Sequence, residues 1–347
     1  MNFTVKLNAT LLDVLKKVDE LSVKNTKLVF VEDDNGKIIG SVSDGACRRA
    51  LISGKRLESL ANEIMNRNFT FLRKGEYDIP TIQKIRQLGF KYVPELNPDG
   101  TLFAVRDFTG GKSYVPVDAV LMAGGKGERL RPLTLDTPKP LLKVADKPII
   151  DYNIENLMHY GVEHINVTVN YLGEQIEKHF ENPVNEVQVN CVREPKFLGT
   201  IGSIKFVKSW YNDTILLMNS DLFTNIDIEA FYLHFLQHNA DMSVAGVPYN
   251  VNIPYGIFEL ENTREIKGIT EKPSYHYYAN AGIYLIKREL LDLIPENEFF
   301  DATDFIDSLI KANKKVIRFP ITGYWIDIGK PDDFKNVQEF ARNIRKS

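Results

Sequence analysis

Two patterns of hydrophobic and polar positions divide the chain. From residue 118 onward, short apolar runs alternate with stretches whose apolar positions recur at helical spacing. The runs at 165–169 and 214–218 predict strands, and the stretches at 148–160 and 228–237 predict helices. This alternation predicts an open α/β sheet, whose ligands bind beyond the carboxyl ends of the strands.

The first third of the chain repeats a different unit, a helix followed by two strands. The strand patterns of the first copy lie within 28–43 and turn at Asn35-Gly36, and those of the second lie within 92–105 and turn at Asp99-Gly100. The apolar positions expected to share one helix face are Leu11, Leu12, Leu15 and Val18 in the first copy and Ile82, Ile85 and Leu88 in the second.

A stretch rich in glycine, serine and proline at 109–117 separates the two patterns and predicts a linker. We therefore expect two domains, 1–113 and 114–347. The 347 residues are long enough for both.

Composition narrows the functional classes. The net charge of −3 argues against a nucleic-acid partner, which needs a basic surface. The start of the chain lacks the pattern of a signal peptide, and no apolar run reaches the roughly 18 residues of a membrane span. Cys47 and Cys191 lie far apart, which argues against a disulfide framework and fits a reducing compartment. We expect a cytoplasmic protein that binds no membrane.

A glycine-rich loop follows the first apolar run of the second region. The run ends at Ala123 and leads into Gly124, Gly125 and Gly127. Glycines let backbone N–H groups approach a phosphate chain, and the spacing fits neither a P-loop nor a dinucleotide fingerprint. Two cations follow, Arg129 and then Lys139, which stands between two prolines that restrict its backbone.

Two aspartates have unusual surroundings. Asp221 follows the strand pattern 214–218, and Asp327 stands between two isoleucines. A carboxylate in an apolar setting is costly unless it is paired, hydrogen-bonded or bound to a metal. Each alone is more often a cap or turn residue.

Together, these motifs resemble the opening and the metal site of the NDP-sugar pyrophosphorylases, a family of sugar-1-phosphate nucleotidyltransferases. The resemblance spans roughly residues 117–345 and implies a Rossmann-like mixed open sheet. It implies transfer of a nucleotide from an NTP to a sugar-1-phosphate, with pyrophosphate released. It further implies that Arg129 and Lys139 contact the triphosphate and that Asp221 and Asp327 bind Mg²⁺, a cation that prefers such hard oxygen ligands.

The same resemblance supplies the sugar side of the site. Glu271 and Lys272, in a Glu-Lys-Pro motif, match the residues that bind the sugar hydroxyls and the sugar phosphate. Tyr255-Gly256 matches a motif that packs against the sugar, and Asn280 and Gly282 match the loop that closes over it.

The segment from Glu194 to Gly199 and Thr200 resembles the part of the family that reads the base. A carboxylate only accepts hydrogen bonds, so Glu194 suits guanine, which offers two adjacent donors. This favours GTP. The alternatives are UTP, dTTP or CTP, with Glu194 paired to Arg193 or Lys196 and reading no base.

Residues 1–113 resemble a tandem CBS module, an α/β unit that often binds adenine nucleotides. The match is best at 40–49, where Ala46 stands in place of the aspartate that holds the ribose in many relatives. Packing and homo-oligomer formation through this module is one interpretation, and nucleotide sensing is the other. The architecture resembles that of guanylyltransferases of legionaminic-acid-type pathways, which implies glucosamine-1-phosphate as substrate. Mannose-1-phosphate, glucose-1-phosphate and a heptose phosphate are the alternatives, glucose-1-phosphate being the one for a UTP-, dTTP- or CTP-using enzyme.

Two rival classes stay open at this point. One is a regulatory protein that binds nucleotide sugars without catalysis. The other is a glycosyltransferase, although the usual Asp-x-Asp metal motif of that class is replaced here by Asn219-Ser-Asp221.

Overall fold

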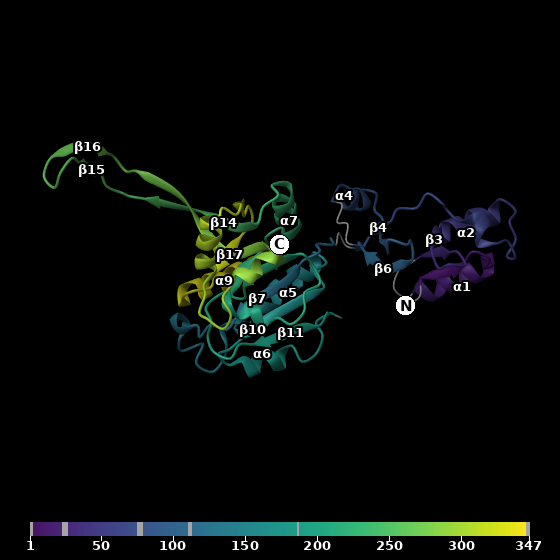
Figure 1. The fold of residues 1–347 in the computed structure, drawn as a ribbon, viewed down its shortest axis with the longest axis horizontal. Coiled ribbons are helices and arrows are strands. Elements are labelled where there is room, and N and C mark those ends of the chain that lie inside the picture. The colour runs from purple at the N-terminus through teal and green to yellow at the C-terminus, as the bar shows by residue number, and fades with distance from the viewer. Residues whose placement is uncertain (1–2, 23–26, 75–78, 110–112, 186, 345–347) are drawn as a thin grey trace. The chain divides into compact units, whose positions relative to one another are not determined.

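The computed structural model describes residues 3–22, 27–74, 79–109, 113–185 and 187–344. The chain forms two compact units, Met1–Tyr114 and Val115–Ser347 (Figure 1). The division falls within the glycine- and proline-containing stretch 109–117. In the described ranges, no helix is both long and apolar enough to cross a bilayer.

The amino-terminal unit contains the predicted repeat. Each copy has a strand, a helix and two further strands, and its sheet pairs the first strand parallel to the second and the second antiparallel to the third. The elements are β1 (Thr4–Lys6), α1 (Leu11–Ser22), β2 (Leu28–Glu32) and β3 (Ile38–Ser43), then β4 (Leu72–Arg73), α4 (Ile79–Gln87), β5 (Tyr92–Leu96) and β6 (Leu102–Asp107). Helices α2 (Asp44–Ile52) and α3 (Ala61–Ile64) join the two copies along the chain.

The buried faces of α1 and α4 differ in part from the prediction. Leu11 and Val18 are buried, but Leu12 is 40% exposed, and Val14 faces the core instead. In the second copy Ile82 and Ile85 are buried, whereas Leu88 lies beyond the end of α4 and is 60% exposed. The helical period was right, but neighbouring leucines cannot all share one face.

The carboxyl-terminal unit is built on a seven-stranded mixed sheet in the order β11-β10-β7-β12-β17-β14-β18. The strands are β7 (Asp118–Ala123), β10 (His164–Val169), β11 (Val189–Arg193), β12 (Thr214–Asn219), β14 (Met242–Asn252), β17 (Ser274–Lys287) and β18 (Val316–Pro320). The first four in this order run parallel, and β17 is antiparallel to both of its neighbours. The predicted mixed open α/β sheet is confirmed.

The unit also contains five α-helices in the described ranges and several two-stranded sheets. The helices are α5 (Ile149–His159), α6 (Gly173–His179), α7 (Ile228–Gln237), α8 (Ala302–Lys311) and α9 (Pro331–Ile344). Strands β7 and β12 are almost entirely buried, as expected for apolar runs covered on both faces. Two further strands, β13 (Leu222–Thr224) and β19 (Trp325–Asp327), pair antiparallel, and β8 (Lys143–Val144) pairs with β9 (Lys147–Pro148).

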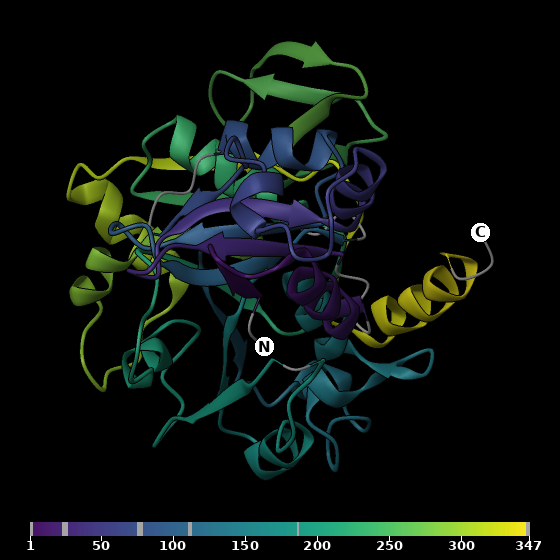
Figure 2. The ribbon, with the colours of Figure 1, turned by 90° about the vertical axis from the view of Figure 1, so that its right-hand side faces the viewer.

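One part of the unit leaves the sheet. Strands β14 and β17 extend beyond their neighbours as a two-stranded ribbon, which ends in the hairpin of β15 (Ile257–Leu260) and β16 (Ile266–Thr270). We call residues 248–278 the arm. Both views show its hairpin standing clear of the rest of the unit (Figure 1 and Figure 2). No residue of the arm is buried.

Candidate functional site

A cavity of about 390 Å³ opens where β7 and β12 end. This is the edge at which open α/β sheets bind ligands. The predicted residues that line it are Ala123, Gly124, Gly125, Gly127, Arg129, Lys139, Glu194, Gly199, Thr200 and Asp221. The fold therefore brings together segments that are up to about a hundred residues apart in sequence.

The glycine loop forms one wall of this cavity and is tightly packed at Gly127. This residue has a φ of +61°, and its carbonyl accepts a 2.8 Å hydrogen bond from the Thr134 hydroxyl. A Cβ at this position would lie 3.0 Å from Thr134 and 3.3 Å from Lys139. Glycine is therefore required both by the backbone conformation and by the close approach of the lysine segment.

Lys139 is the most enclosed cation of the cavity. Only 8% of the residue is exposed, and its ammonium forms an ion pair with the Asp221 carboxylate and lies 3.9 Å from Asp327 Oδ1. A buried lysine needs such partners to stay charged. Pro138 and Pro140 restrict the backbone on either side, so the ammonium is held in place.

Asp221 and Asp327 lie side by side because of the β13–β19 pairing. Leu222 is opposite Asp327, and the Ile328 N–H donates to the Asp221 carbonyl at 3.4 Å. Burial, followed by the charge of Asp221, raises the pKa of the Asp327 carboxyl, while the charges of Lys139 and Arg129 oppose this rise. Arg129 is close by, since a Cβ on Gly329 would lie 3.4 Å from its guanidinium.

These two carboxylates fit a divalent cation. Oδ1 of Asp221 is buried and has no hydrogen-bond partner among the described residues, which is a costly arrangement for a carboxylate oxygen. The neighbouring Asp327 adds a second acceptor of the same kind. No group of three or more histidine, cysteine or acidic side chains in the described ranges could hold a metal. A cation here would thus have two protein ligands, leaving its other positions to substrate oxygens and water, as Mg²⁺ commonly does.

Glu194 lies against the glycine loop. It is 4% exposed, and a Cβ on Gly124 would come within 2.3 Å of its Oε1. Its Oε2 accepts a hydrogen bond of 3.2 Å from the Leu198 N–H. Burial raises the pKa of the Glu194 carboxyl to about 7, and the hydrogen bond from Leu198 lowers it in part. The side chain is therefore an oriented acceptor that is close to changing charge at neutral pH.

Glu194 does not pair with its neighbour in the chain. The Arg193 guanidinium instead bonds Glu174 at 2.6 Å and Glu177 at 2.7 Å. Arg193 ends β11 with its side chain bonded to α6, while Glu194, the next residue, lies against the glycine loop. This geometry argues against the alternative in which Arg193 forms an ion pair with the Glu194 carboxylate.

Gly199 and Thr200 shape the cavity mainly through backbone geometry. Gly199 has a φ of +80°, and a Cβ there would lie 2.6 Å from the Phe300 carbonyl oxygen. The Thr200 N–H and hydroxyl both donate to Asp301, at 2.8 and 3.1 Å. These contacts tie the segment to the start of α8.

The predicted sugar-side residues are divided between two places. Asn280 and Gly282 lie at the base of the arm, where the Asn280 side chain accepts the Gly282 N–H at 2.9 Å. A Cβ on Gly282 would lie 2.5 Å from Asn219 Nδ2, and Asn219 lines the cavity. In contrast, Tyr255, Gly256, Glu271 and Lys272 belong to the arm and do not line the cavity.

Sequence reasoning missed some residues that line the cavity. Asn219 ends β12 two residues before Asp221, and the rule that ligands bind beyond strand ends could have identified it. Phe197 is 50% exposed in the cavity wall next to Glu194 and could stack on a base. Nothing in the local pattern distinguishes it from an ordinary loop phenylalanine.

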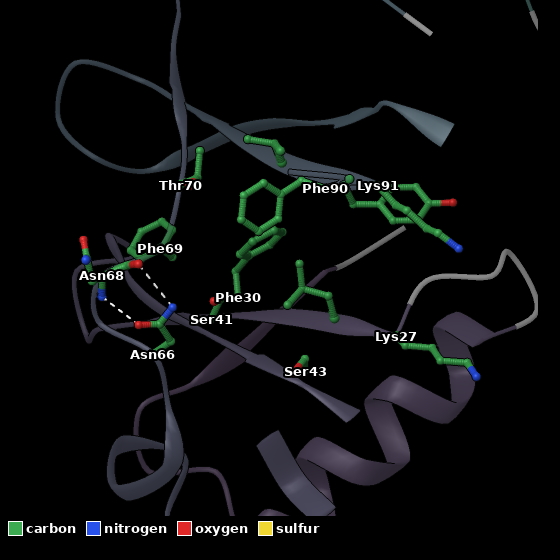
Figure 3. Close-up of a pocket in the computed structure, with 14 residues that line it drawn as sticks. Lys27, Phe30, Ser41, Ser43, Asn66, Asn68, Phe69, Thr70, Phe90 and Lys91 are labelled. Atoms are coloured by element: carbon green, nitrogen blue, oxygen red, sulfur yellow. Dashed lines mark hydrogen bonds between the residues drawn. The ribbon is translucent and has the colours of Figure 1, made fainter. Parts of the chain in front are cut away.

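A second cavity, of about 450 Å³, lies in the amino-terminal unit (Figure 3). Residues of both repeats line it, with Phe30 and Phe90 among its aromatic side chains and Lys27 and Lys91 among its charged ones. Ala46 is not among the lining residues. Its N–H donates to Ser43 at 3.2 Å and so caps the start of α2.

Comparison with known proteins places the carboxyl-terminal unit in a family. The nucleotidyl transferase family model matches residues 118–344, and the chain belongs to this family. The match begins with β7 and ends with α9, so it covers the sheet, the cavity and the arm.

Individual relatives fall in the same class. A putative mannose-1-phosphate guanyltransferase of Sulfolobus acidocaldarius is 30% identical over 64% of this chain and 62% of its own length. A probable mannose-1-phosphate guanylyltransferase 2 of Arabidopsis thaliana is also 30% identical, over 66% of each chain. The crystal structure of HddC from Yersinia pseudotuberculosis matches 65% of this chain and 99% of that one, with a TM-score of 0.52 and 28% identity. The chain spans less than two thirds of the length of the Sulfolobus relative.

Proposed function

We propose that the protein is a sugar-1-phosphate nucleotidyltransferase, which converts an NTP and a sugar-1-phosphate to an NDP-sugar and pyrophosphate. The observation that carries this proposal is the pair of carboxylates, Asp221 and Asp327, beside the buried Lys139 at the end of the glycine loop. This combination suits a reaction between two anions, in which positioning and charge stabilisation supply most of the catalysis.

In this proposal the reaction is a single in-line displacement. An oxygen of the sugar phosphate attacks the α-phosphorus, a new P–O bond forms, and the bond to the β-phosphate oxygen breaks. Arg129, Lys139 and the N–H groups of the glycine loop stabilise the triphosphate and the leaving pyrophosphate. The nucleophile is already ionised at neutral pH, so no general base is needed. Asp221 and Asp327 would hold Mg²⁺, which would neutralise charge on the α-phosphate.

GTP is the proposed nucleotide. Glu194 is buried, oriented and free of the Arg193 ion pair, and a carboxylate can accept both donors on the guanine edge. The names of relatives point the same way, since two are called mannose-1-phosphate guanyltransferases or guanylyltransferases and HddC has been crystallised with GMP-PN.

For the sugar we propose glucosamine-1-phosphate first and mannose-1-phosphate second. Glu271 would accept hydrogen bonds from sugar hydroxyls, and Lys272 would bind the sugar phosphate. Tyr255-Gly256 would pack against the ring, with Asn280 and Gly282 closing the site from the base of the arm.

The test is a panel of each NTP with several sugar-1-phosphates and Mg²⁺, in which pyrophosphate release is measured. We expect release with GTP to exceed that with UTP, dTTP or CTP. If no pair of substrates releases pyrophosphate, the proposed enzymatic activity is rejected, and a binding protein without catalysis is favoured. Consumption of an NDP-sugar with transfer of the glycan to an acceptor would favour a glycosyltransferase.

For residues 1–113 we propose a tandem CBS module that binds a nucleotide. The duplicated sheets and the cavity that both repeats line support this, because aromatic side chains suit a base and lysines suit phosphates. Calorimetric titration of AMP and ATP into the full chain, compared with Lys91→Ala, tests it. AMP, which lacks a triphosphate, should bind the wild type and bind Lys91→Ala more weakly. Absence of AMP and ATP binding beyond the catalytic cavity would leave the module with a packing role.

A further inference from the structure

The arm has an exposed apolar face. Directly opposed residues of an antiparallel pair point to the same side, and so do residues two apart. Tyr249 is opposite Tyr277, and Val251 is opposite Tyr275, so these four side chains form one stripe. Their exposed fractions range from 37% to 60%, and in the described part of the chain no further strand pairs with this part of the ribbon.

The opposite face of the same ribbon is polar beyond Pro248 and Tyr278, where the Arg318 guanidinium lies 3.8 Å from the centroid of the Tyr278 ring. Asn250 and His276 bond each other at 2.7 Å, and Asn252 and Ser274 bond each other at 2.7 Å. The hairpin shows the same division, since Glu259 accepts a bond from Thr270 on one side while apolar side chains gather on the other. The exposed apolar residues of the hairpin are Phe258, Leu260, Ile266 and Ile269.

Such a ribbon needs a partner. A two-stranded hairpin alone is marginal in water, and contiguous exposed apolar surface marks an interaction site. The two strands of the ribbon pair without interruption from Gly246 and Asn280 to Asn252 and Ser274. The ribbon therefore does not fold back onto its own unit, and in a single copy the apolar stripe stays in solvent.

The arm also holds Glu271 and Lys272, which belong to the proposed site, away from the cavity of the same chain. Its base is fixed there, since Gly282 approaches Asn219 and the Trp325 indole donates to the Ala281 carbonyl at 2.9 Å. From Asn280 to Ser274 a strand covers about 20 Å, and Lys272 lies two residues further. The four-carbon stem of a lysine cannot span that distance back to Asp221.

The cluster on the arm is nevertheless built as a unit. A Cβ on Gly256 would lie 2.8 Å from Glu271 Oε2, so Gly256 and Glu271 are in contact across the hairpin. Lys272 adopts a φ of +45°, a conformation that a non-glycine residue rarely takes without a structural or functional reason. Among the described residues, Lys139 is the only lysine that lines the cavity of the body, and it is committed to Asp221 and Asp327. The described lining of the cavity therefore offers Arg129 but no uncommitted lysine for a second anionic substrate, and the arm presents one.

We infer that the arm crosses to a second copy of this chain and delivers Lys272 and Glu271 to the partner's cavity. The exchange is reciprocal, so two copies form a closed dimer with two shared sites. The apolar stripe is covered in this dimer, and the positive charge of Lys272 meets the anionic substrates bound near the carboxylates. This inference rests on the proposed function, since it assigns the sugar phosphate to Lys272.

Complementation between inactive variants tests the exchange. Asp221→Asn removes a residue of the body and Lys272→Ala removes one of the arm, so each homodimer should lose most of its activity when the sugar phosphate is well below its KM. Co-expressed with different tags and purified through both, the mixed dimer contains one site with an intact body and an intact arm. We expect about half of the wild-type turnover per dimer, because one of its two sites is complete.

Two matched mixtures serve as controls. Asp221→Asn with Asp327→Asn places a defect in both bodies, and Glu271→Ala with Lys272→Ala places one in both arms, so neither mixture should regain turnover. A mixed dimer of Asp221→Asn and Lys272→Ala that stays as inactive as its parents, while the wild type is active, overturns the exchange. A wild type that is inactive with every substrate pair instead rejects the proposed function.

A second measurement uses the stripe itself. Tyr249→Ser with Tyr277→Ser changes exposed side chains and should leave the fold of a single copy intact. On dilution, the specific activity of this variant should fall at a higher protein concentration than that of the wild type. The fall should coincide with dissociation of the dimer, measured by sedimentation. Full activity of a chain that sedimentation shows to be a monomer overturns the proposal.

Discussion

The cavity of the body and the arm carry residues assigned to one reaction, but they are held in different ways. Lys139 is 8% exposed and fixed by two prolines and two carboxylates, whereas Tyr255 on the arm is 73% exposed. The first group is positioned by the core of a seven-stranded sheet. The second is supported only by a ribbon, so its final place depends on what covers the ribbon.

This difference separates two kinds of preorganisation. The residues proposed to bind the nucleotide come together within one chain, because the ends of β7 and β12 meet at one edge of the sheet. The sugar half is locally ordered but is carried away from that edge. Catalysis by charge stabilisation requires both halves within contact of the reacting atoms.

The largest effect is expected at the carboxylate pair. Asp327→Asn should reduce turnover by at least about 10²-fold, because charge that develops on the phosphates loses its stabilisation. Unfolding should not shift to lower temperature, since the change removes a like charge beside Asp221. Turnover and thermal unfolding measure this. Asp292→Asn, on the exposed surface, is the control. Near-normal turnover of Asp327→Asn would contradict the role of the carboxylate pair in the cavity of the body.

Loss of the arm cation should have a more selective effect. Lys272→Ala removes a charge-assisted contact of about 1.5–3 kcal/mol, so kcat/KM for the sugar phosphate should fall roughly 10- to 100-fold. The KM for GTP should stay unchanged, because the nucleotide half is built from the body. Steady-state kinetics with each substrate varied would show this split. Lys267→Ala, in β16 of the same arm, should behave as wild type, and an equal effect of both variants would remove the role of Lys272.

The glycine loop offers a matched pair of substitutions. A Cβ on Gly124 would meet Glu194 Oε1 at 2.3 Å, whereas a Cβ on Gly125 would meet nothing within 4 Å. Gly124→Ala should displace the carboxylate and raise the KM for GTP by about tenfold, the equivalent of one lost hydrogen bond. Gly125→Ala should change the KM much less. Similar values for the two variants would mean that the position of Glu194 does not govern GTP binding.

The smallest effect concerns pH. The pKa of the Glu194 carboxyl is about 7, above its usual value, so the neutral form predominates below pH 7 and the ionised form above it. Guanine donors favour the ionised form, and the KM for GTP should fall as pH rises from 6 to 8. Glu194→Gln should lack the part of this pH dependence that comes from Glu194. Because GTP itself titrates in the same way with both proteins, its contribution cancels when their KM values are compared.

Stability follows the same titration with a definite sign. Because the pKa is raised in the folded state, the free protein loses stability as pH rises from about 4.5 to 7, where the unfolded chain has already released its proton. Measured relative to wild type, the free energy of unfolding of Glu194→Gln should thus increase by on the order of 1–3 kcal/mol between pH 5 and pH 8. Urea unfolding at both pH values measures the gain, and no difference would place the pKa of Glu194 near that of an exposed glutamate.

Local sequence patterns predicted much of the fold. The helix at 228–237 has the predicted bounds, and the predicted strands at 165–169 and 214–218 differ by one residue from those in the structure. Long apolar runs and helical periods are short-range signals, which makes them readable without tertiary contacts. Leu12 and Leu88 show the limit, because the choice of buried face depends on what packs against the helix.

The sequence by itself determined the chemistry of the candidate site: the glycine loop, the lysine between prolines, and the two carboxylates in apolar surroundings. Tertiary structure alone decided which of these residues meet. Strand pairing joined Asp221 to Asp327, the ending of two parallel strands placed Glu194 against Gly124, and the extension of β14 and β17 carried Lys272 away. A motif specifies which groups are available, but contacts between distant segments depend on the register and length of the strands that carry them.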